Sequence, residues 1–178
     1  MTKVEMRKQM LNKMKSFSST NKQSADSSLA NQLFDTETYQ NAQTVGIVLS
    51  MPHEVDTYNI IKHMFEDKKQ VFVPETNYKL HAMIFKEITD FAEIELDSKG
   101  INHVIADNET TENLDLLIVP GVVFNHQGYR IGYGGGYFDK FLAHHKQDTI
   151  SLVYDFQIDS FVIEDHDQPV DTLIIATT

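Results

Sequence analysis

A cluster of glycines followed by a helical pattern is the part of this sequence best suited to chemistry. Gly132, Gly134, Gly135 and Gly136 are half of the eight glycines in the chain, and the residues from 137 to 145 have helical periodicity. Glycine permits positive φ and close approach of the backbone. A glycine loop that enters a helix can therefore aim several amide N–H groups at phosphate oxygens, where the helix dipole also favours an anion. By glycine count alone, a structural turn is an equally good interpretation.

The residues on either side of the glycines favour a nucleotide site. Arg130 precedes them and Asp139 follows them. A guanidinium neutralises phosphate, and a carboxylate in the first helical turn can hold Mg²⁺ through oxygen. The loop differs from a Walker loop because no Gly-Lys-Ser/Thr follows, and from a dinucleotide fingerprint because Tyr137 stands at the third glycine position. Taken alone, Asp139 would be an ordinary partner of the helix dipole.

The charge distribution excludes some ligand classes and favours others. The net charge is −11, so we expect neither nucleic acid nor an anionic membrane as a partner. Residues 1–22 hold six cations and one acidic residue, a local charge of +5, whereas the remainder holds nine cations and 25 acidic residues, or −16. The basic end suits a small anion. Arg7 and Arg130 are the only arginines, and arginine offers a planar fork that lysine lacks.

Hydrophobic periodicity predicts the elements that must position these groups. Thr2 and Glu5 have capping-box spacing and begin a first helix, on which Lys3 and Arg7 share one face. We predict further helices over residues 24–39 (after a connection at 16–23), 57–69 and 137–145, and strands over 45–49, 71–73 (ending at Pro74), 80–85, 116–119, 150–154 and 173–176, with a mostly polar stretch at 86–113.

Strands that alternate with helices predict an α/β fold, an open, mostly parallel, doubly wound sheet with helices on both faces. Such sheets bind ligands beyond the carboxyl ends of their strands. We expect one domain over residues 1–178, because the chain is of ordinary domain length and has no linker. The stripe of Ile60, Ile61, Met64 and Phe65 is expected in the core.

Residue types and patterns that the sequence lacks indicate where the protein acts and which chemistry it can use. There is no cysteine, so any chemistry must use oxygen and nitrogen groups, and a cytoplasmic location is allowed. No apolar run approaches the length of a membrane span. The eight histidines, including the adjacent His144 and His145, lack a metal-binding spacing and are expected at the surface. We expect a cytoplasmic monomer.

Four sets of residues together resemble one known family, the 5-formyltetrahydrofolate cyclo-ligases, also called 5,10-methenyltetrahydrofolate synthetases. The resemblance runs in order along nearly the whole chain, and the long glycine block is its most specific part. It includes an amino-terminal Lys-x-x-x-Arg at Lys3 and Arg7, a Ser-Met-x-x-Glu-x-x-Thr segment at Ser50, Met51, Glu54 and Thr57, the glycine block from Pro120 to Asp139, and a late His-Asp-x-x-x-Asp at His166, Asp167 and Asp171.

Three positions of the glycine block depart from the family pattern. Some members have lysine where Gly135 stands and arginine where Tyr133 stands, and many have tyrosine where Phe138 stands. The loop of this chain is therefore expected to rely more on backbone amides and on Arg130.

The resemblance implies ATP- and Mg²⁺-dependent conversion of 5-formyltetrahydrofolate to 5,10-methenyltetrahydrofolate, with ADP and phosphate released. ATP is then a co-substrate and both ligands are small molecules. The residues that the resemblance assigns to ATP are Lys3, Arg7, Arg130, Ile131, Gly132, Tyr133, Gly134, Gly135, Gly136, Tyr137 and Phe138; those assigned to the folate are Leu49, Met51, Glu54, Phe124, Tyr133 and Tyr137; the metal ligands are Asp139 and Asp167 with Asp171 as an alternate; and Arg130 and Tyr137 are expected to be catalytic.

Each assignment has a simpler alternative. Lys3 and Arg7 would also fit a solvated helix face, Glu54 a cap for the helix that begins near Thr57, and Asp167 with Asp171 a pair of turn carboxylates.

Two other protein classes remain open. A nicotinamide or flavin oxidoreductase should have the third glycine and an acidic residue about 20 positions further on, and a nucleic-acid module would use the basic first helix against the acidic remainder.

Overall fold

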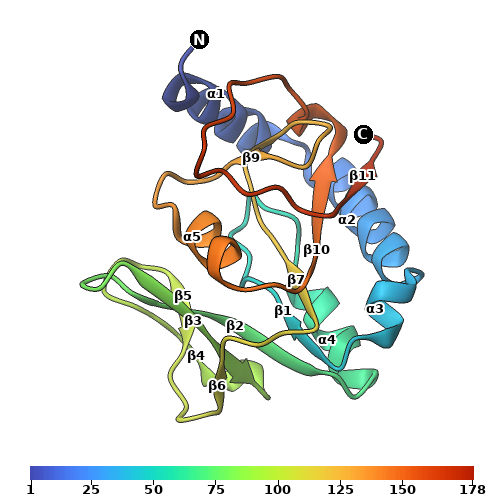
Figure 1. Cartoon of the computed structure of the whole chain (residues 1–178). Helices are drawn as coiled ribbons and strands as arrows, with labels where there is room; N and C mark the ends of the chain where they lie inside the picture. The colour runs from blue at the N-terminus through green and yellow to red at the C-terminus, as the bar shows by residue number, and fades with distance from the viewer.

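The computed structural model describes all of residues 1–178 and is built on a seven-stranded sheet in the order β11-β10-β7-β1-β2-β3-β6 (Figure 1). Neighbouring strands from β11 to β2 are parallel, while β3 pairs antiparallel with β2 and β6. The strands of this sheet are β1 (Thr44–Gly46), β2 (Gln70–Asn77), β3 (Ala82–Ile88), β6 (Thr110–Thr111), β7 (Leu116–Ile118), β10 (Asp148–Tyr154) and β11 (Thr172–Ala176).

The helices cover both faces of the sheet, which confirms the doubly wound prediction (Figure 1). Leu29 and Leu33 of one helix and Ile60, Ile61 and Met64 of another pack with the strands in the largest core cluster. Phe141 packs on the opposite face in a second cluster. The helices are α1 (Lys3–Ser16), α2 (Ser19–Phe34), α3 (Glu37–Asn41), α4 (Tyr58–Glu66) and α5 (Tyr137–His144), with 3₁₀ turns at Phe91–Glu93 and Asp155–Gln157.

Chain order places a topological switch point between β1 and β7. From β1 the chain crosses over by α4 to β2 on one side, whereas from β7 it crosses by α5 to β10 on the other. The two crossover helices lie on opposite faces. Loops that leave the carboxyl ends of β1 and β7 therefore diverge and open a crevice, which is where open α/β sheets bind ligands.

Two small hairpins stand outside the main sheet. β4 (Ile94–Leu96) pairs with β5 (Asn102–Val104), and β8 (Val123–Phe124) pairs with β9 (Arg130–Ile131). They account for part of the polar 86–113 stretch and for the start of the glycine block, and the sequence pattern predicted neither.

None of the helices combines the length and apolar character that a membrane span requires.

The hairpin of β8 and β9 connects α1 to the glycine block. Met10 and Met14 of α1 pack on Val122, Val123 and Ile131 in a third core cluster. The turn of the hairpin requires glycine at position 128, where φ is +91° and an added Cβ would lie 2.5 Å from the carbonyl oxygen of Val170. This close approach fixes the hairpin against the segment that precedes β11.

The first helix begins as predicted, while the second differs from its prediction at both ends. The Thr2 side chain accepts a hydrogen bond from the Glu5 amide and caps α1. Helix α2 starts at Ser19, not Ser24, because Ser18 caps it by accepting from the Asn21 amide. Its first turns bury no side chain before Ala25, so they lack the apolar period that reveals a helix. At the other end, Thr36 caps a separate helix, α3.

Two predicted strands also have different bounds. β2 does not stop at Pro74 but continues to Asn77, paired with β3. β1 pairs only with Gln70 to Phe72, so the strand beyond is free on that side, where the missing N–H of proline is tolerated. The strand predicted over 45–49 is regular only as Thr44–Gly46. Its continuation stays buried and leads into the loop before α4.

Candidate active site

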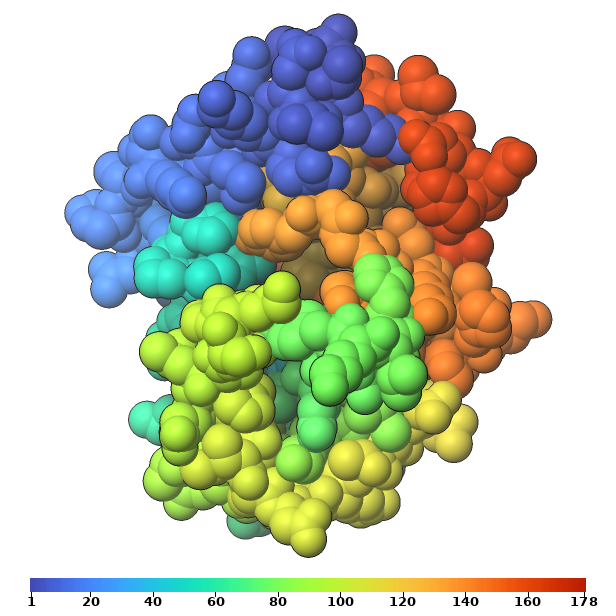
Figure 2. Space-filling model, turned by 90° about the vertical axis from the view of Figure 1, so that its left-hand side faces the viewer, coloured from blue at the N-terminus to red at the C-terminus, as the bar shows by residue number.

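A hollow opens in the surface where the loops after β1 and β7 diverge. In Figure 2 it is bordered by the orange glycine loop, the teal loop after β1, and the green and yellow-green hairpins of β2–β3 and β4–β5. Most of the residues predicted to bind ligands lie on the first two of these borders.

The glycine loop is held by Arg7 from α1. The Arg7 Nε donates a 2.6 Å hydrogen bond to the carbonyl oxygen of Gly132. Its guanidinium carbon lies 3.6 Å from the point that a Cβ on Gly134 would occupy, and Gly134 has a φ of +102° that disfavours any other residue. The terminal nitrogens of Arg7 lie 3.6 and 3.7 Å from the same point and have no protein partner. This places a cation with free donors beside a glycine loop, as a phosphate site requires.

Lys3, which was predicted to bind ATP, contacts the carboxyl-terminal part of the chain. Its Nζ lies 3.3 Å from Asp167 Oδ2 and 3.3 Å from Glu164 Oε1. The Asp167 side chain is only 7% exposed and also accepts a hydrogen bond from the Glu164 amide. Lys3 thus has a specific ionic partner and is more than a solvated charge.

Arg130 is the most buried charged residue near the hollow. Only 7% of it is exposed, and its Nη2 lies 3.2 Å from Asp139 Oδ1 while its Nη1 donates to the Gln168 carbonyl at 3.1 Å. The Gln168 amide in turn donates to Asp139 Oδ1. Burial lowers the pKa of Arg130, whereas the charges of Asp139 and Asp167 act in the opposite direction. Arg130 thus orients Asp139 and ties α5 to the segment that carries Asp167.

The carboxylates fit a Mg²⁺ ion that is shared with phosphate. No group of three or more His, Cys, Asp or Glu side chains is placed to hold a metal ion. Magnesium at phosphoryl-transfer sites is commonly held by one or two carboxylates together with phosphate oxygens. Asp139 Oδ2 makes no protein hydrogen bond or ion pair and can meet this requirement, whereas Asp167 Oδ2 is held by Lys3 and the Glu164 amide, so Asp167 could join it only by exchanging those contacts.

Asp171 does not join this pair, which corrects its assignment as an alternate ligand. Its Oδ2 accepts from the Thr149 amide, and its own amide donates to the Thr149 hydroxyl. Asp171 immediately precedes β11, and Thr149 lies at the start of β10. The carboxylate therefore joins the amino ends of two parallel strands, β10 and β11.

The loop after β1 is closed by Ser50 and Thr57. Each donates its backbone amide to the other's hydroxyl, at 2.9 and 3.0 Å, and the Thr57 hydroxyl donates to the Val48 carbonyl. Inside this closed loop, Glu54 Oε1 accepts from the Met51 amide at 2.8 Å. Glu54 does not cap α4, whose first turn is met by Asp56 through the Tyr58 amide. The loop instead presents the Glu54 carboxyl at the crevice.

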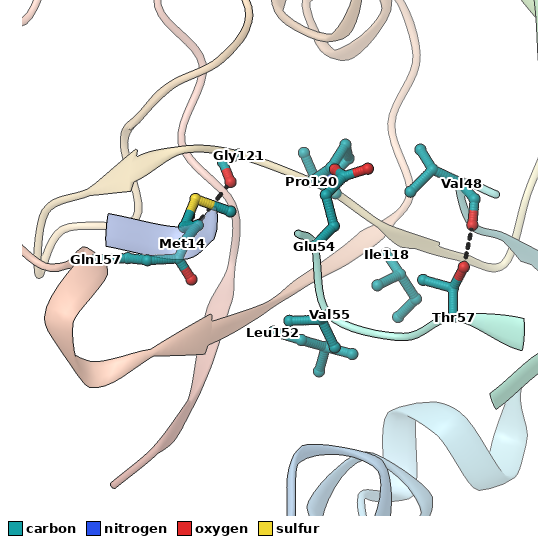
Figure 3. Close-up of a pocket in the computed structure, with 11 residues that line it drawn as sticks. Met14, Val48, Glu54, Val55, Thr57, Ile118, Pro120, Gly121, Leu152 and Gln157 are labelled. Carbon is teal, nitrogen blue, oxygen red and sulfur yellow. Dashed lines mark hydrogen bonds between the residues drawn. The ribbon is translucent and has the colours of Figure 1, made fainter. Parts of the chain in front are cut away.

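Glu54 lines a small cavity below the hollow. Figure 3 shows Glu54 and Val55 beside Ile118, the last residue of β7, and Pro120, which follows it. The cavity has about 40 Å³ of open volume, enough for a few waters but far below the size of a ligand pocket. Burial raises the pKa of Glu54, and the contacts with Met51 and Tyr133 act against that rise. The cavity by itself is therefore too small to be the site of a ligand.

The two loop tyrosines predicted to contact ligands have histidine partners. The Tyr133 hydroxyl lies 2.8 Å from His53 Nε2, and burial together with the charge of Glu54 raises the pKa of Tyr133. Tyr137 stacks on His81 at 4.4 Å between ring centroids. His81 lies in the turn between β2 and β3, so the tip of that hairpin touches the start of α5.

Four residues of the predicted site are turned away from the hollow. Phe124 is 1% exposed, and its ring lies 2.6 Å from where a Cβ on Gly121 would be. This corrects the expectation that Phe124 faces the folate. Ile131 and Leu49 are also core residues, and the Phe138 ring packs edge-on against Phe85. The side chain of Ile131 is buried and that of Phe138 is half-buried, while Met51 is 44% exposed at the loop surface.

Sequence reasoning missed three residues that shape the site. His53 and His81, expected at the surface with the other histidines, touch Tyr133 and Tyr137. Gln168 joins Arg130 to Asp139 by its backbone alone. His53 lies within the Ser-Met-x-x-Glu segment, which was a signal of position, but nothing in the sequence marks its partner 80 residues away.

Comparison with known proteins decides the family. The profile described as the 5-formyltetrahydrofolate cyclo-ligase family matches residues 1–176. The chain belongs to this family. A 5-formyltetrahydrofolate cyclo-ligase from Mus musculus is 32% identical over 151 residues, covering 76% of this chain and 74% of the relative. The enzyme of the same name from Escherichia coli K12 is 27% identical over 141 residues, covering 75% and 78%.

Solved structures agree with this membership. The NMR structure of Aquifex aeolicus 5,10-methenyltetrahydrofolate synthetase has a TM-score of 0.86 and 25% identity, covering 98% of this chain and 90% of that one. A 5,10-methenyltetrahydrofolate synthetase from Mycoplasma pneumoniae has a TM-score of 0.80 at 23% identity, covering 98% of each chain, and shows the shared fold. The chain is therefore an enzyme of a ligase family with the α/β fold described above.

Proposed function

We propose that the protein catalyses the ATP- and Mg²⁺-dependent cyclisation of 5-formyltetrahydrofolate to 5,10-methenyltetrahydrofolate, with release of ADP and phosphate. The observation that carries the proposal is the arrangement at the switch point. Arg7 and the glycine loop form a phosphate-binding border, and Glu54 on the neighbouring loop faces the same crevice. Family membership supplies the substrate class.

The chemistry explains why two ligands must meet here. A formamide oxygen is a poor leaving group. Transfer of the γ-phosphoryl group breaks its bond to ADP and forms a P–O bond to the formyl oxygen, which activates the formyl carbon. N10 then attacks that carbon, loses its proton and closes the ring as phosphate leaves. No protein nucleophile is needed, so the protein has to align two ligands and stabilise phosphoryl charge.

The cations divide this work. Arg7 is placed to donate its free terminal N–H groups to phosphate oxygens next to the amides of the glycine loop. Arg130 acts indirectly, because it holds Asp139 and the Gln168 segment in place and does not itself contact the phosphate. Asp139 and Asp167 would hold the metal. When bound, Mg²⁺ neutralises charge on the phosphate oxygens and orients them.

The folate side of the site consists of Glu54 and the two loop tyrosines. A carboxylate accepts hydrogen bonds from the N–H groups of a pterin-like ring, and Glu54 is held for this by the Met51 amide. The Tyr133 ring is 49% exposed and offers a face for stacking. Tyr137 lies between the glycine loop and the β2–β3 hairpin, where it can contact both ligands.

The direct test is to incubate the purified protein with ATP, Mg²⁺ and 5-formyltetrahydrofolate and to follow the methenyl chromophore. We expect product only when nucleotide and divalent metal are both present. Full activity without nucleotide, or turnover of NAD(P)H in its place, would refute the proposal.

A binding experiment separates the other protein classes. Thermal stabilisation is compared for ATP with Mg²⁺, 5-formyltetrahydrofolate, NAD(P) and an oligonucleotide, since a ligand that binds only the folded state raises the unfolding midpoint. We expect shifts with the first two ligands. Stabilisation by NAD(P) alone would favour an oxidoreductase, and stabilisation by the oligonucleotide alone a nucleic-acid module.

A further inference from the structure

One hydrogen bond joins the two loops that border the crevice. His53, in the loop after β1, places its Nε2 2.8 Å from the hydroxyl of Tyr133 in the glycine loop. The two rings meet edge to face, with centroids 6.1 Å apart. The bond bridges 80 positions of sequence and lies next to Glu54. Gly132, on the other side of Tyr133, is held by Arg7, so the beginning of the glycine loop is fastened from two directions.

The bond between His53 and Tyr133 makes one tautomer of the histidine more favourable. The Tyr133 hydroxyl can donate to Nε2 or accept from it, and a neutral imidazole carries its single proton on one of the two ring nitrogens. Burial and the charge of Glu54 both raise the pKa of Tyr133, so the hydroxyl stays protonated. In either direction, the bond selects a single tautomer of His53.

The surroundings of His53 keep its ring neutral. Burial lowers the pKa of His53, and the charges of Lys15 on α1 and Lys22 on α2 lower it further. Glu54 and Tyr133 are the other titratable groups beside it. A neutral ring with one N–H has a defined donor, which suits it to hold a hydroxyl in one orientation.

We propose that His53 is a positioning residue, which holds the Tyr133 hydroxyl and so orients the Tyr133 ring towards the folate. The role rests on the proposed function for its ligand. It predicts a loss in folate binding and little change in the phosphoryl step, because His53 lies on the Glu54 side of the crevice and touches neither Arg7 nor Asp139.

The test compares two amides at position 53. The side-chain nitrogen of glutamine can take the place of Nε2, whereas that of asparagine ends near Nδ1 and cannot reach Tyr133. We expect His53→Ala and His53→Asn to raise the KM for 5-formyltetrahydrofolate about three- to tenfold, the usual effect of one neutral hydrogen bond. The kcat and the KM for ATP should stay within about twofold, and His53→Gln should restore most of the loss.

A double-mutant cycle with Tyr133→Phe tests the coupling. If the two groups act as one unit, the double variant His53→Ala/Tyr133→Phe should be no worse than the more damaged single variant. Unfolding midpoints are measured for every variant, so that a folding defect is not read as a binding defect. Equal effects of glutamine and asparagine, multiplying effects in the double variant, or a rise confined to the KM for ATP would overturn the proposal.

A measurement without turnover separates this proposal from the proposed function. Nitrogen-15 NMR of the His53 ring should show one dominant tautomer in the wild type and a changed tautomer balance in Tyr133→Phe. The same tautomer balance in both proteins would show that His53 is not hydrogen-bonded to Tyr133 in solution. If the wild type forms no methenyl product, the proposed function fails and the folate role of His53 fails with it, while the NMR result still decides the contact.

Discussion

The two arginines of the chain lie in opposite environments within the same site. Arg130 is 7% exposed, and its terminal nitrogens contact Asp139 and the Gln168 carbonyl. Arg7 is partly exposed, and it uses only Nε on a protein acceptor, the Gly132 carbonyl. Burial with satisfied donors makes an arginine part of the framework, because removing it leaves a buried charge uncompensated. Free donors at a loop make it available to a ligand.

This comparison revises the expectation that Arg130 itself forms the phosphate fork. Its position before the glycines indicated a direct contact, yet its guanidinium holds Asp139 and the backbone at Gln168. Arg7, on the first helix, has the geometry that was predicted for Arg130. Arg7 is thus available to a ligand, while Arg130, 123 positions away in sequence, supports the structure of the site. Each substitution below tests one of these two roles.

The largest effect is expected at Arg130. Arg130→Ala leaves Asp139 without its partner and should lower the free energy of unfolding by about 3 kcal/mol, as measured by urea denaturation. Arg130→Lys keeps the charge but cannot meet both Asp139 and the Gln168 carbonyl, so we expect an intermediate loss and reduced turnover. Wild-type stability and turnover in Arg130→Lys would contradict a framework role.

Arg7 should show the opposite pattern, with lost activity in a stable protein. Arg7→Ala removes charge-assisted hydrogen bonds, and we expect kcat/KM for ATP to fall about ten- to a hundredfold with little change in the unfolding midpoint. Arg7→Lys should recover only part of this, since an ammonium is a point charge. The matched control is Lys8→Ala, an exposed neighbour on the same helix; an equal loss there would mean that general charge, not Arg7, matters.

Substitution of Glu54 tests whether a partly bonded carboxylate also acts on a ligand. One of its oxygens is held by the Met51 amide. Glu54→Gln keeps the shape and removes the charge. We expect about a tenfold loss in kcat/KM for 5-formyltetrahydrofolate and nearly unchanged affinity for ATP, both from steady-state kinetics. Normal kinetics with a lowered unfolding midpoint would assign Glu54 a purely structural role.

Gly134 tests the loop that Arg7 contacts. Gly134 has a φ of +102° and Gly132 has no such requirement, with nothing within 4 Å of an added Cβ. Gly134→Ala should therefore cost about 1–2 kcal/mol of unfolding free energy, and Gly132→Ala much less. Equal losses at the two positions in chemical denaturation would show that the loop conformation is not the cause.

The smallest effect is a pH dependence at Glu54. Burial raises the pKa of Glu54 above its ordinary value of 4.5, so its contribution to stability is full below that value and is lost as the pH rises through the folded-state pKa. Relative to the wild type, Glu54→Gln should be more stable at neutral pH than at pH 4. Unfolding midpoints recorded across this range decide the sign, and a difference that does not change with pH would contradict the assigned burial.

Local signals in the sequence were enough for much of the fold. The Thr2 cap, the apolar stripe of α4 and the continuous apolar strand at β7 are visible within a few residues, and the structure confirms each. The prediction failed where tertiary pairing decides the result. β2 passes through Pro74 because β3 continues to pair with it, and α2 begins before its apolar face does.

The site was predictable in its residue types more than in its contacts. The glycine block, Arg7 and Glu54 were selected by their chemistry and by family resemblance. Their partners depend on which loops the sheet brings together. The Tyr133–His53 bond, the Arg130–Gln168 bond and the diversion of Asp171 to Thr149 join segments that are 80, 38 and 22 positions apart, and no local pattern encodes them.

The ion pair between Lys3 and Asp167 has a consequence for synthesis of the protein. Its two members are 164 positions apart, so a ribosome that adds about 5–20 residues each second needs roughly 10–30 s to supply the second after the first. For most of that interval α1 lacks β8–β9 to pack on, and for all of it Lys3 lacks Asp167. The nascent chain must therefore carry its basic first helix without its full set of contacts until nearly all of the protein has been made.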